Sequence, residues 1–141
     1  MRFVTLLFIS SLLVLVSTCV SSEKNSNRKE DFSNLVSLNP PGEQKQEDSN
    51  IYIDTVEAIT LEEQKALLIS GSFPDACTHL KSATDTLTND TLKITLKAWR
   101  ETDRMCAQVL TSFSYIYEGI PEEVLNNRST VTINNSSYPI N

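Results

Sequence analysis

Alternation of apolar and polar residues over residues 91–98 is the feature that most constrains the fold of this chain. Leu92, Ile94, Leu96 and Ala98 lie on one side of an extended segment, and the Thr and Lys residues between them lie on the other. A period of two is typical of a strand with one face buried and one face in solvent. We therefore expect residues 91–98 to form a strand that covers a core on one side.

Weaker strand patterns occur before and after this segment. Residues 60–64 resemble a turn between two strands, residues 88–90 resemble another, and residues 121–125 are compatible with a single helical turn. Short strands separated by turns predict an all-β fold, here a single small antiparallel immunoglobulin-like β-sandwich. The other predicted strands are residues 51–59, 65–73, 78–87, 113–117 and 130–134, of which 65–73 is the most apolar and is expected to be the more central.

The N-terminus has the pattern of an export signal. Arg2 precedes an apolar run over residues 3–16, and small residues follow up to Ser22. The apolar run is shorter than the stretch of about 20 residues that spans a membrane, which favours a cleaved signal peptide over residues 1–22. Residues 23–50 are mostly polar and are predicted to be a flexible linker, with residues 32–36 as a candidate for docking as a strand or a helical turn. The linker is either a stalk or a lead-in without a role.

Cys19 leaves two fates open for the exported chain. Residues 16–19, Val-Ser-Thr-Cys, resemble a lipobox, whose cysteine carries lipid in the mature protein. Thr18 and Val16 depart from the residues usual at those positions. We expect the mature protein to be secreted, periplasmic or held in the cell envelope, and lipid-anchored if Cys19 is modified, since two or more acyl chains anchor stably.

The remaining two cysteines, Cys77 and Cys106, predict one disulfide. An even number of cysteines in an exporting compartment favours pairing. A bond across this separation would constrain the unfolded chain by roughly 3.6 kcal/mol on the loop-entropy account. A zinc site would need more ligands, and His79 is the only histidine in the chain.

Charge argues against nucleic acid as a partner. The full chain has a formal net charge of −6, and removal of residues 1–22 takes away Arg2 alone, which leaves −7. An acidic surface repels phosphate backbones and anionic lipid. We therefore expect contact with a membrane only through the signal peptide or a lipid on Cys19.

The segment from Phe73 to Thr78, Phe-Pro-Asp-Ala-Cys-Thr, carries a resemblance to a known group. It resembles an uncharacterised family of small exported bacterial domains with a Leu-Pro-Asp-Gly-Cys-Thr motif and a second cysteine in a Cys-x-Gln context, which here is Cys106-Ala107-Gln108. Ala76 replaces the usual Gly, and residues 119–124 lack the Gly-rich turn of the group. The resemblance covers residues 51–135 and implies an immunoglobulin-like sandwich with a Cys77–Cys106 bond. It implies no reaction.

The sequence contains no set of residues that is typical of a catalytic site. His79 is the only imidazole, and it lies in a polar strand beside a cysteine that is expected to be bonded. We therefore predict no catalytic, metal or cofactor-binding residues and a protein that is not an enzyme. Trp99 breaks the preceding alternation, so it either covers an edge or provides an exposed aromatic side chain for a partner.

Two functions fit these features. The first is an exported non-enzymatic binding or structural module of the cell envelope, which contacts a protein or glycan through sheet edges or end loops. Its candidate contact residues are Pro74, Asp75 and Trp99. The alternative is a protease-inhibitor-like module in which residues 74–76 or 100–105 enter an enzyme cleft.

N-glycan acceptor patterns add a further question about modification. The pattern Asn-x-Ser/Thr begins at Asn89, Asn127, Asn134 and Asn135. These patterns have meaning only in a host that glycosylates exported proteins, and they arise by chance in an Asn- and Ser-rich chain.

Overall fold

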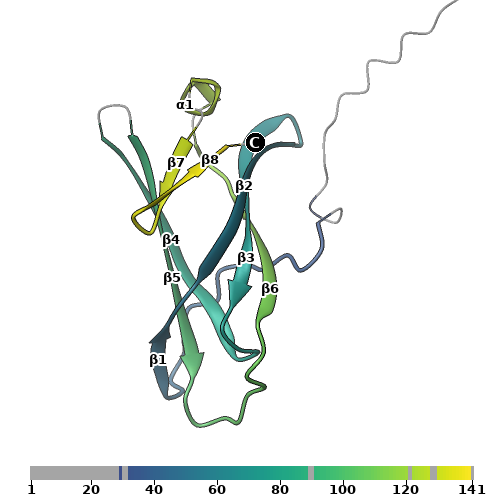
Figure 1. Cartoon of the computed structure of the whole chain (residues 1–141), viewed down its shortest axis with the longest axis vertical. Helices are drawn as coiled ribbons and strands as arrows, with labels where there is room; N and C mark the ends of the chain where they lie inside the picture. The colour runs from purple at the N-terminus through teal and green to yellow at the C-terminus, as the bar shows by residue number, and fades with distance from the viewer. Residues whose placement is uncertain (1–28, 30–31, 89–90, 121, 128–129, 141) are drawn as a thin grey trace, which may run out of the picture.

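The computed structural model describes residues 29, 32–88, 91–120, 122–127 and 130–140. These residues form two packed sheets and one short helix (Figure 1). The elements are β1 Gln46–Ser49, β2 Tyr52–Leu61, β3 Gln64–Phe73, β4 Thr78–Thr88, β5 Thr91–Glu101, β6 Thr111–Tyr117, α1 Glu122–Asn126, β7 Thr130–Ile133 and β8 Ser136–Pro139. The predicted all-β, antiparallel sandwich is confirmed.

One sheet contains β2, β3 and β6, with β3 in the centre. The other is built around β5, which pairs along its length with β4 on one side. The opposite side of β5 is shared: β1 pairs with residues 98–101, and β7 pairs in parallel with residues 93–94. The β5–β7 contact is the one parallel pairing between named strands among the described residues.

The alternation in β5 appears directly as burial. Leu92, Ile94, Leu96 and Ala98 all face the space between the sheets, where the main core lies. β3 is buried on both faces, because Leu67 and Ile69 enter the main core while Ala66 and Leu68 belong to a second apolar cluster. The burial of both faces agrees with the predicted central position of this strand.

Two parts of the predicted linker are folded against the sandwich. β1 forms from residues 46–49, and Leu35 makes an isolated parallel bridge to Ser114 of β6. The amide of Val36 donates to the Ser114 carbonyl at 2.8 Å, and Phe32 packs against the second apolar cluster. Residues 46–49 therefore belong to a sheet, and residues 32–36 dock on β6, which is the alternative that the sequence offered for them. Residues 1–28, with the predicted signal peptide and Cys19, lie outside the described residues.

Gly71 allows a close crossing between β2 and β3. The register of this pair shifts between Ile53 and Thr55, which marks a β-bulge at Asp54. A Cβ atom at position 71 would lie 2.0 Å from the main-chain oxygen of Tyr52. No side chain fits there, and the bulge depends on glycine for its backbone approach.

Candidate functional site

The end of the sandwich where β3 passes into β4 contains the predicted disulfide. Cys77 and Cys106 are bonded, with 5.7 Å between their Cα atoms and a sequence separation of 29. Cys77 lies just before β4, and Cys106 lies in the loop of residues 102–110 that joins β5 to β6. The bond therefore fastens this loop to the β3–β4 corner. The amide of Ala76 reinforces the attachment by donating to the carbonyl of Ala107 at 3.2 Å.

Asp75 organises the corner from inside. Its side chain is 2% exposed, and its Oδ1 accepts hydrogen bonds at 2.9 Å from the amide of Cys77 and from the hydroxyl of Thr78. A carboxylate that accepts from the backbone two residues ahead forms an Asx-turn, which satisfies backbone donors where the pairing of a strand ends. Asp75 is thus occupied by the fold and does not offer a free carboxylate to a partner, whereas Pro74 is half-buried.

Arg100 connects this carboxylate to the first strand. Its Nε lies 3.2 Å from Oδ2 of Asp75, and its Nη1 lies 3.4 Å from Oε1 of Glu47. The Nε–H bond does not point at the carboxylate oxygen, so the contact with Asp75 is an ion pair without an aligned hydrogen bond. The guanidinium nevertheless places positive charge next to a buried negative one, which reduces the penalty of burying the carboxylate.

Trp99 is covered and does not form a surface patch. Its side chain is 1% exposed, and its Nε1 donates to the carbonyl of Asn39 at 2.6 Å. The amide of Asn39 donates in turn to the carbonyl of Leu80 at 2.8 Å, so the segment before β1 closes over the indole. Of the two alternatives for Trp99, the structure shows the covered edge. The prediction of an exposed aromatic contact at this position is wrong.

His79 packs beside Trp99 and does not meet a nucleophile in the described part of the chain. The two rings are 5.1 Å apart between centroids, and Nε2 of His79 lies 3.8 Å from Oε1 of Glu101. The described residues contain no group of three or more His, Cys, Asp or Glu side chains placed to hold a metal ion. Their only α-helix, α1, is five residues long, and no described helix is long and apolar enough to cross a membrane.

The loop of residues 102–110 exposes apolar side chains although it is fastened. Met105 is 100% exposed, Val109 56% and Leu110 65%. Cys106 and Ala107, which lie between them, hold the loop to the corner. The loop forms the lower end of the molecule in Figure 1. Apolar side chains kept in solvent on a restrained loop are typical of a contact surface.

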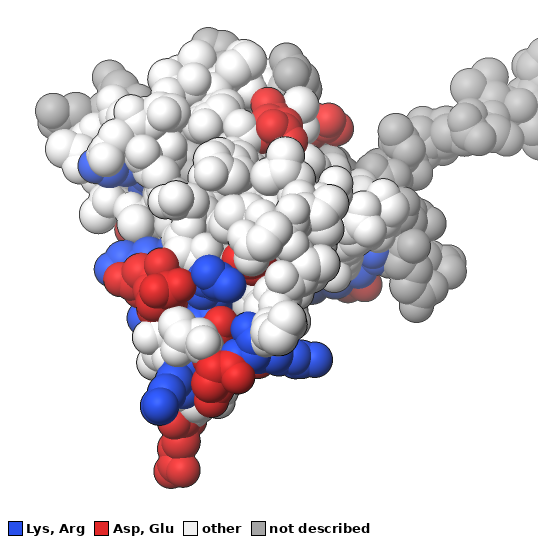
Figure 2. Space-filling model, turned by 60° about the horizontal axis from the view of Figure 1, so that its bottom comes forward, with Lys and Arg blue, Asp and Glu red and all other residues white. Residues whose placement is uncertain are grey.

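Charged side chains of both signs gather in the lower part of the view in Figure 2, where the lower end of the molecule in Figure 1 comes forward. They are paired with one another: Lys81 with Asp48 at 3.5 Å, Arg100 with Glu47, and Arg104 with Glu101 at 3.6 Å. Exposed pairs of this kind add little stability. They place charges of both signs at the end of the sandwich that carries the apolar loop.

Comparison with protein families decides to which group the fold belongs. The family described as the ORF11 beta-sandwich domain matches this chain over residues 67–140, which is just over half of its length. This chain belongs to the ORF11 beta-sandwich domain family. No curated protein and no solved structure matches it. The matched region of the ORF11 domain begins in β3 and contains both cysteines and the loop of residues 102–110. Membership of the group with the Leu-Pro-Asp-Gly-Cys-Thr motif, which the sequence resembles, stays a prediction.

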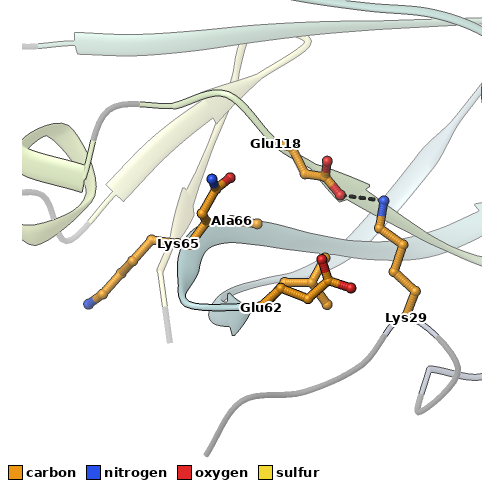
Figure 3. A pocket seen from close by; sticks show the side chains of 7 residues that line it. Lys29, Glu62, Lys65, Ala66 and Glu118 are labelled. Atoms are coloured by element: carbon orange, nitrogen blue, oxygen red, sulfur yellow. Dashed lines mark ion pairs between the residues drawn. The ribbon is translucent and has the colours of Figure 1, made fainter.

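A shallow hollow lies beside the turn between β2 and β3 (Figure 3), and of its lining residues only Glu118 belongs to the matched residues 67–140. Its volume is about 140 Å³, and Lys29 and Glu118 face each other across it with 2.6 Å between Nζ and Oε1. The hydrogen bond and the charge of Glu118 raise the pKa of Lys29. A hollow this small, with its charges paired across it, is well below the size of ligand pockets, which hold roughly 300 Å³ or more. The loop of residues 102–110 is therefore the better candidate site.

The sequence points to the corner and does not reveal the surface. The cysteine pair and the Pro74-Asp75 turn direct attention to this end, whereas Val109 and Leu110 were not among the predicted contact residues. The signal for them is the sequence Gln-Val-Leu directly after Cys106-Ala107, an apolar pair in a segment without strand alternation.

Proposed function

We propose that this chain is an exported, non-enzymatic binding module of the cell envelope that contacts a partner protein through residues 102–110. The observation that carries the proposal is the full exposure of Met105 on a loop fastened by the Cys77–Cys106 bond. A loop that is already restrained loses less conformational entropy when it binds, so more of its contact energy remains as affinity. Exposed aliphatic and Met side chains beside charged pairs favour a protein surface over a glycan.

The size of the loop sets the expected strength of binding. A short loop at one end of a small sandwich can bury an area at the low end of specific interfaces, below about 1,200 Å². Interfaces of that size are common among transient complexes. We therefore expect a micromolar contact, strengthened if several copies are held on one surface.

The test is the binding of the purified, labelled protein to the envelope fraction of the cells that produce it. Replacement of Met105, Val109 and Leu110 by Ser should lower retention at least tenfold, because the apolar contact is removed. The matched control is Leu87→Ser, since Leu87 is also an exposed leucine, at 51%, but lies near the other end of β4. Equal retention of the two variants and the unmodified protein would refute the proposal.

Export and anchoring belong to the same proposal. We propose cleavage at one of two positions: after residue 22, which releases the protein, or before Cys19, which leaves that cysteine as the first residue to carry the lipid. The intact mass of the mature protein separates them, because cleavage before Cys19 with added acyl chains and cleavage before Glu23 give different masses. A mass that still includes residues 1–22 would refute export by cleavage.

A protease-inhibitor-like module is the second candidate, and one observation favours it. Of the two loops considered for this role, residues 74–76 contain the buried Asp75, whereas Arg104 and Met105 are well exposed. A fastened loop with an exposed Arg-Met pair has the form that a protease cleft accepts. If this is its role, the purified domain slows at least one protease class at submicromolar concentration, and Arg104→Ala with Met105→Ala relieves the inhibition. No effect across a panel of classes would eliminate it.

A further inference from the structure

Two overlapping N-glycan acceptor patterns occupy the turn between β7 and β8. Asn134-Asn135-Ser136 and Asn135-Ser136-Ser137 share two residues, and the sequence does not choose between them. In the structure Ile133 pairs with Ser136, so Asn134 and Asn135 form a two-residue turn. Both have positive φ, 48° and 71°, which asparagine tolerates better than most residues. The turn stands out at the side of the sandwich (Figure 1).

The side-chain amide of Asn134 is already used by the fold. Its Oδ1 accepts from the amide of Leu96 at 2.9 Å, and its Nδ2 donates to the carbonyl of the same residue at 2.9 Å. The two bonds continue the β5–β7 pairing past the end of β7, where the amide of Asn134 donates to the carbonyl of Ile94 at 3.1 Å. A two-point contact with one residue requires the hydrogen on Nδ2 that lies on the same side as Oδ1.

A sugar on Asn134 would occupy the position of that hydrogen. Glycosylation turns the side chain into a secondary amide, and secondary amides prefer the arrangement of a trans peptide bond. In that arrangement the sugar carbon lies on the same side as Oδ1, and the remaining hydrogen points back toward Cβ. The donor to Leu96 is then absent, and the sugar carbon collides with the strand. A glycan on Asn134 therefore requires the side chain to leave Leu96, with the loss of both hydrogen bonds.

Asn135 differs from Asn134 in its contacts and not in its exposure, since both residues are exposed and the two bonds to Leu96 belong to Asn134. Asn135 is exposed at the tip of the turn, and the hydroxyl-bearing residue two positions ahead, Ser137, is exposed as well. We propose that Asn135, and not Asn134, is an N-glycan acceptor of this chain. The acceptor pattern at Asn89 and the one at Asn127 include residues outside the described part of the chain.

The transfer balances without an oxidant or reductant. Nδ2 of Asn135 forms a bond to the anomeric carbon of the first sugar of a lipid-linked oligosaccharide, and it gives up one proton. The bond from that carbon to the lipid pyrophosphate breaks, and the pyrophosphate leaves with the electron pair. The inference rests on the proposed export, because the donor and its transferase lie on the secretory pathway.

Two single substitutions separate the two acceptor patterns without touching either asparagine. Ser137→Ala destroys the pattern of Asn135 and leaves that of Asn134, whereas Ser136→Ala destroys the pattern of Asn134 and leaves that of Asn135. Both serines are exposed in β8, so the variants are matched. The full chain with its own signal region is produced in cells that carry out N-glycosylation, and the secreted protein is mapped by mass spectrometry. Trypsin cleaves after Arg128, which isolates residues 129–141 in one peptide.

The expected result is a glycan on Asn135 in the unmodified protein and in Ser136→Ala, and none on this peptide in secreted Ser137→Ala. A glycan on Asn134 of any secreted form, or an unmodified peptide in the unmodified protein and Ser136→Ala, would overturn the inference. Failure of export would be seen separately, as absence of all forms from the medium. A glycan at this turn leaves the loop of residues 102–110 open, since β7–β8 and that loop belong to different parts of the sandwich.

Discussion

The guanidinium of Arg100 lies beside the carboxylate of Asp75, with 3.2 Å between Nε and Oδ2. Asp75 comes from the β3–β4 corner and is 2% exposed, and Arg100 comes from the end of β5. The pair joins the two sheets next to the disulfide. The corner to which the 102–110 loop is bonded therefore contains a buried ion pair as well as the disulfide.

Replacement of Asp75 by Ala should lower the free energy of unfolding by about 3 kcal/mol, because two hydrogen-bond donors lose their acceptor and the Arg100 guanidinium loses its buried counter-charge. Asp75→Asn should cost less, since it keeps the Oδ1 acceptor for Cys77 and Thr78, although it replaces Oδ2 beside Arg100 by an amide donor. Denaturant unfolding measures both. Asp48→Ala is the control, as its exposed pair with Lys81 should be worth less than about 1 kcal/mol. Equal losses of stability for Asp75→Ala and Asp48→Ala would contradict the assigned role.

Removal of the disulfide should both destabilise the domain and loosen one loop. The double substitution Cys77→Ala with Cys106→Ala should cost roughly 3.6 kcal/mol on the loop-entropy account. Amide hydrogen exchange should rise most in residues 102–110, while the buried centre of β3 should keep its place among the slowest amides. A uniform rise across all strands would show that the bond does not act on the loop in particular.

Gly71 should not accept a side chain. Gly71→Ala is expected to cost about 3 kcal/mol, because its Cβ would be 2.0 Å from the Tyr52 oxygen and that atom is part of the backbone. Gly42→Ala is the matched control, since the new Cβ there would meet the flexible end of the Gln44 side chain. A thermal melt of both variants is sufficient. A Gly71→Ala variant as stable as Gly42→Ala would show that the bulge can rearrange.

Tyr117 makes the free energy of unfolding depend on pH in alkaline solution. Its hydroxyl donates to Oδ1 of Asp85 at 2.5 Å, and burial together with this hydrogen bond raises the pKa of Tyr117 above its ordinary value. Because the pKa of Tyr117 is higher in the folded state than in the unfolded state, its hydroxyl contributes fully to stability below the unfolded-state pKa of about 10. This contribution to stability is lost as the pH rises from that value toward the folded-state pKa. Unfolding by urea should therefore need less denaturant above about pH 10.

Tyr117→Phe is the variant that isolates this effect. It should be less stable by about 1 kcal/mol at neutral pH, because the hydrogen bond is gone. The variant should lose less stability at alkaline pH than the unmodified protein does. It should still lose some, because burial also raises the pKa of Tyr115, which remains in the variant. The same alkaline slope in both proteins would contradict the assignment to Tyr117.

Much of the fold was predictable because it depends on local alternation. The period of two located six of the eight strands, and the apolar run of residues 65–73 indicated the central strand β3. β1 has no such signal, since Gln46–Ser49 is wholly polar and its first three residues are exposed, so it has no buried face to create a pattern. β8 has none either, because it is four residues long and ends in Pro139.

The only part of the candidate site that the sequence predicts is the corner closed by the Cys77–Cys106 disulfide. The even cysteine pair alone is enough to locate the corner. The burial of Trp99 rests on the Asn39 carbonyl 60 positions earlier in the chain, and no local pattern predicts such a contact. The exposure of Met105, Val109 and Leu110 has the same origin, since it follows from how residues 106 and 107 are fastened and not from their own sequence.

Site-specific crosslinking is the most direct way to find out whether residues 102–110 form the partner-binding surface. A photoreactive amino acid is placed at position 105 in one sample and at position 87 in another, and each protein is irradiated on the envelope fraction of the producing cells. We expect a discrete covalent adduct from position 105 that an excess of protein without the photoreactive group prevents, and none from position 87. Adducts of equal yield at both positions, or an adduct from position 87 alone, would contradict it.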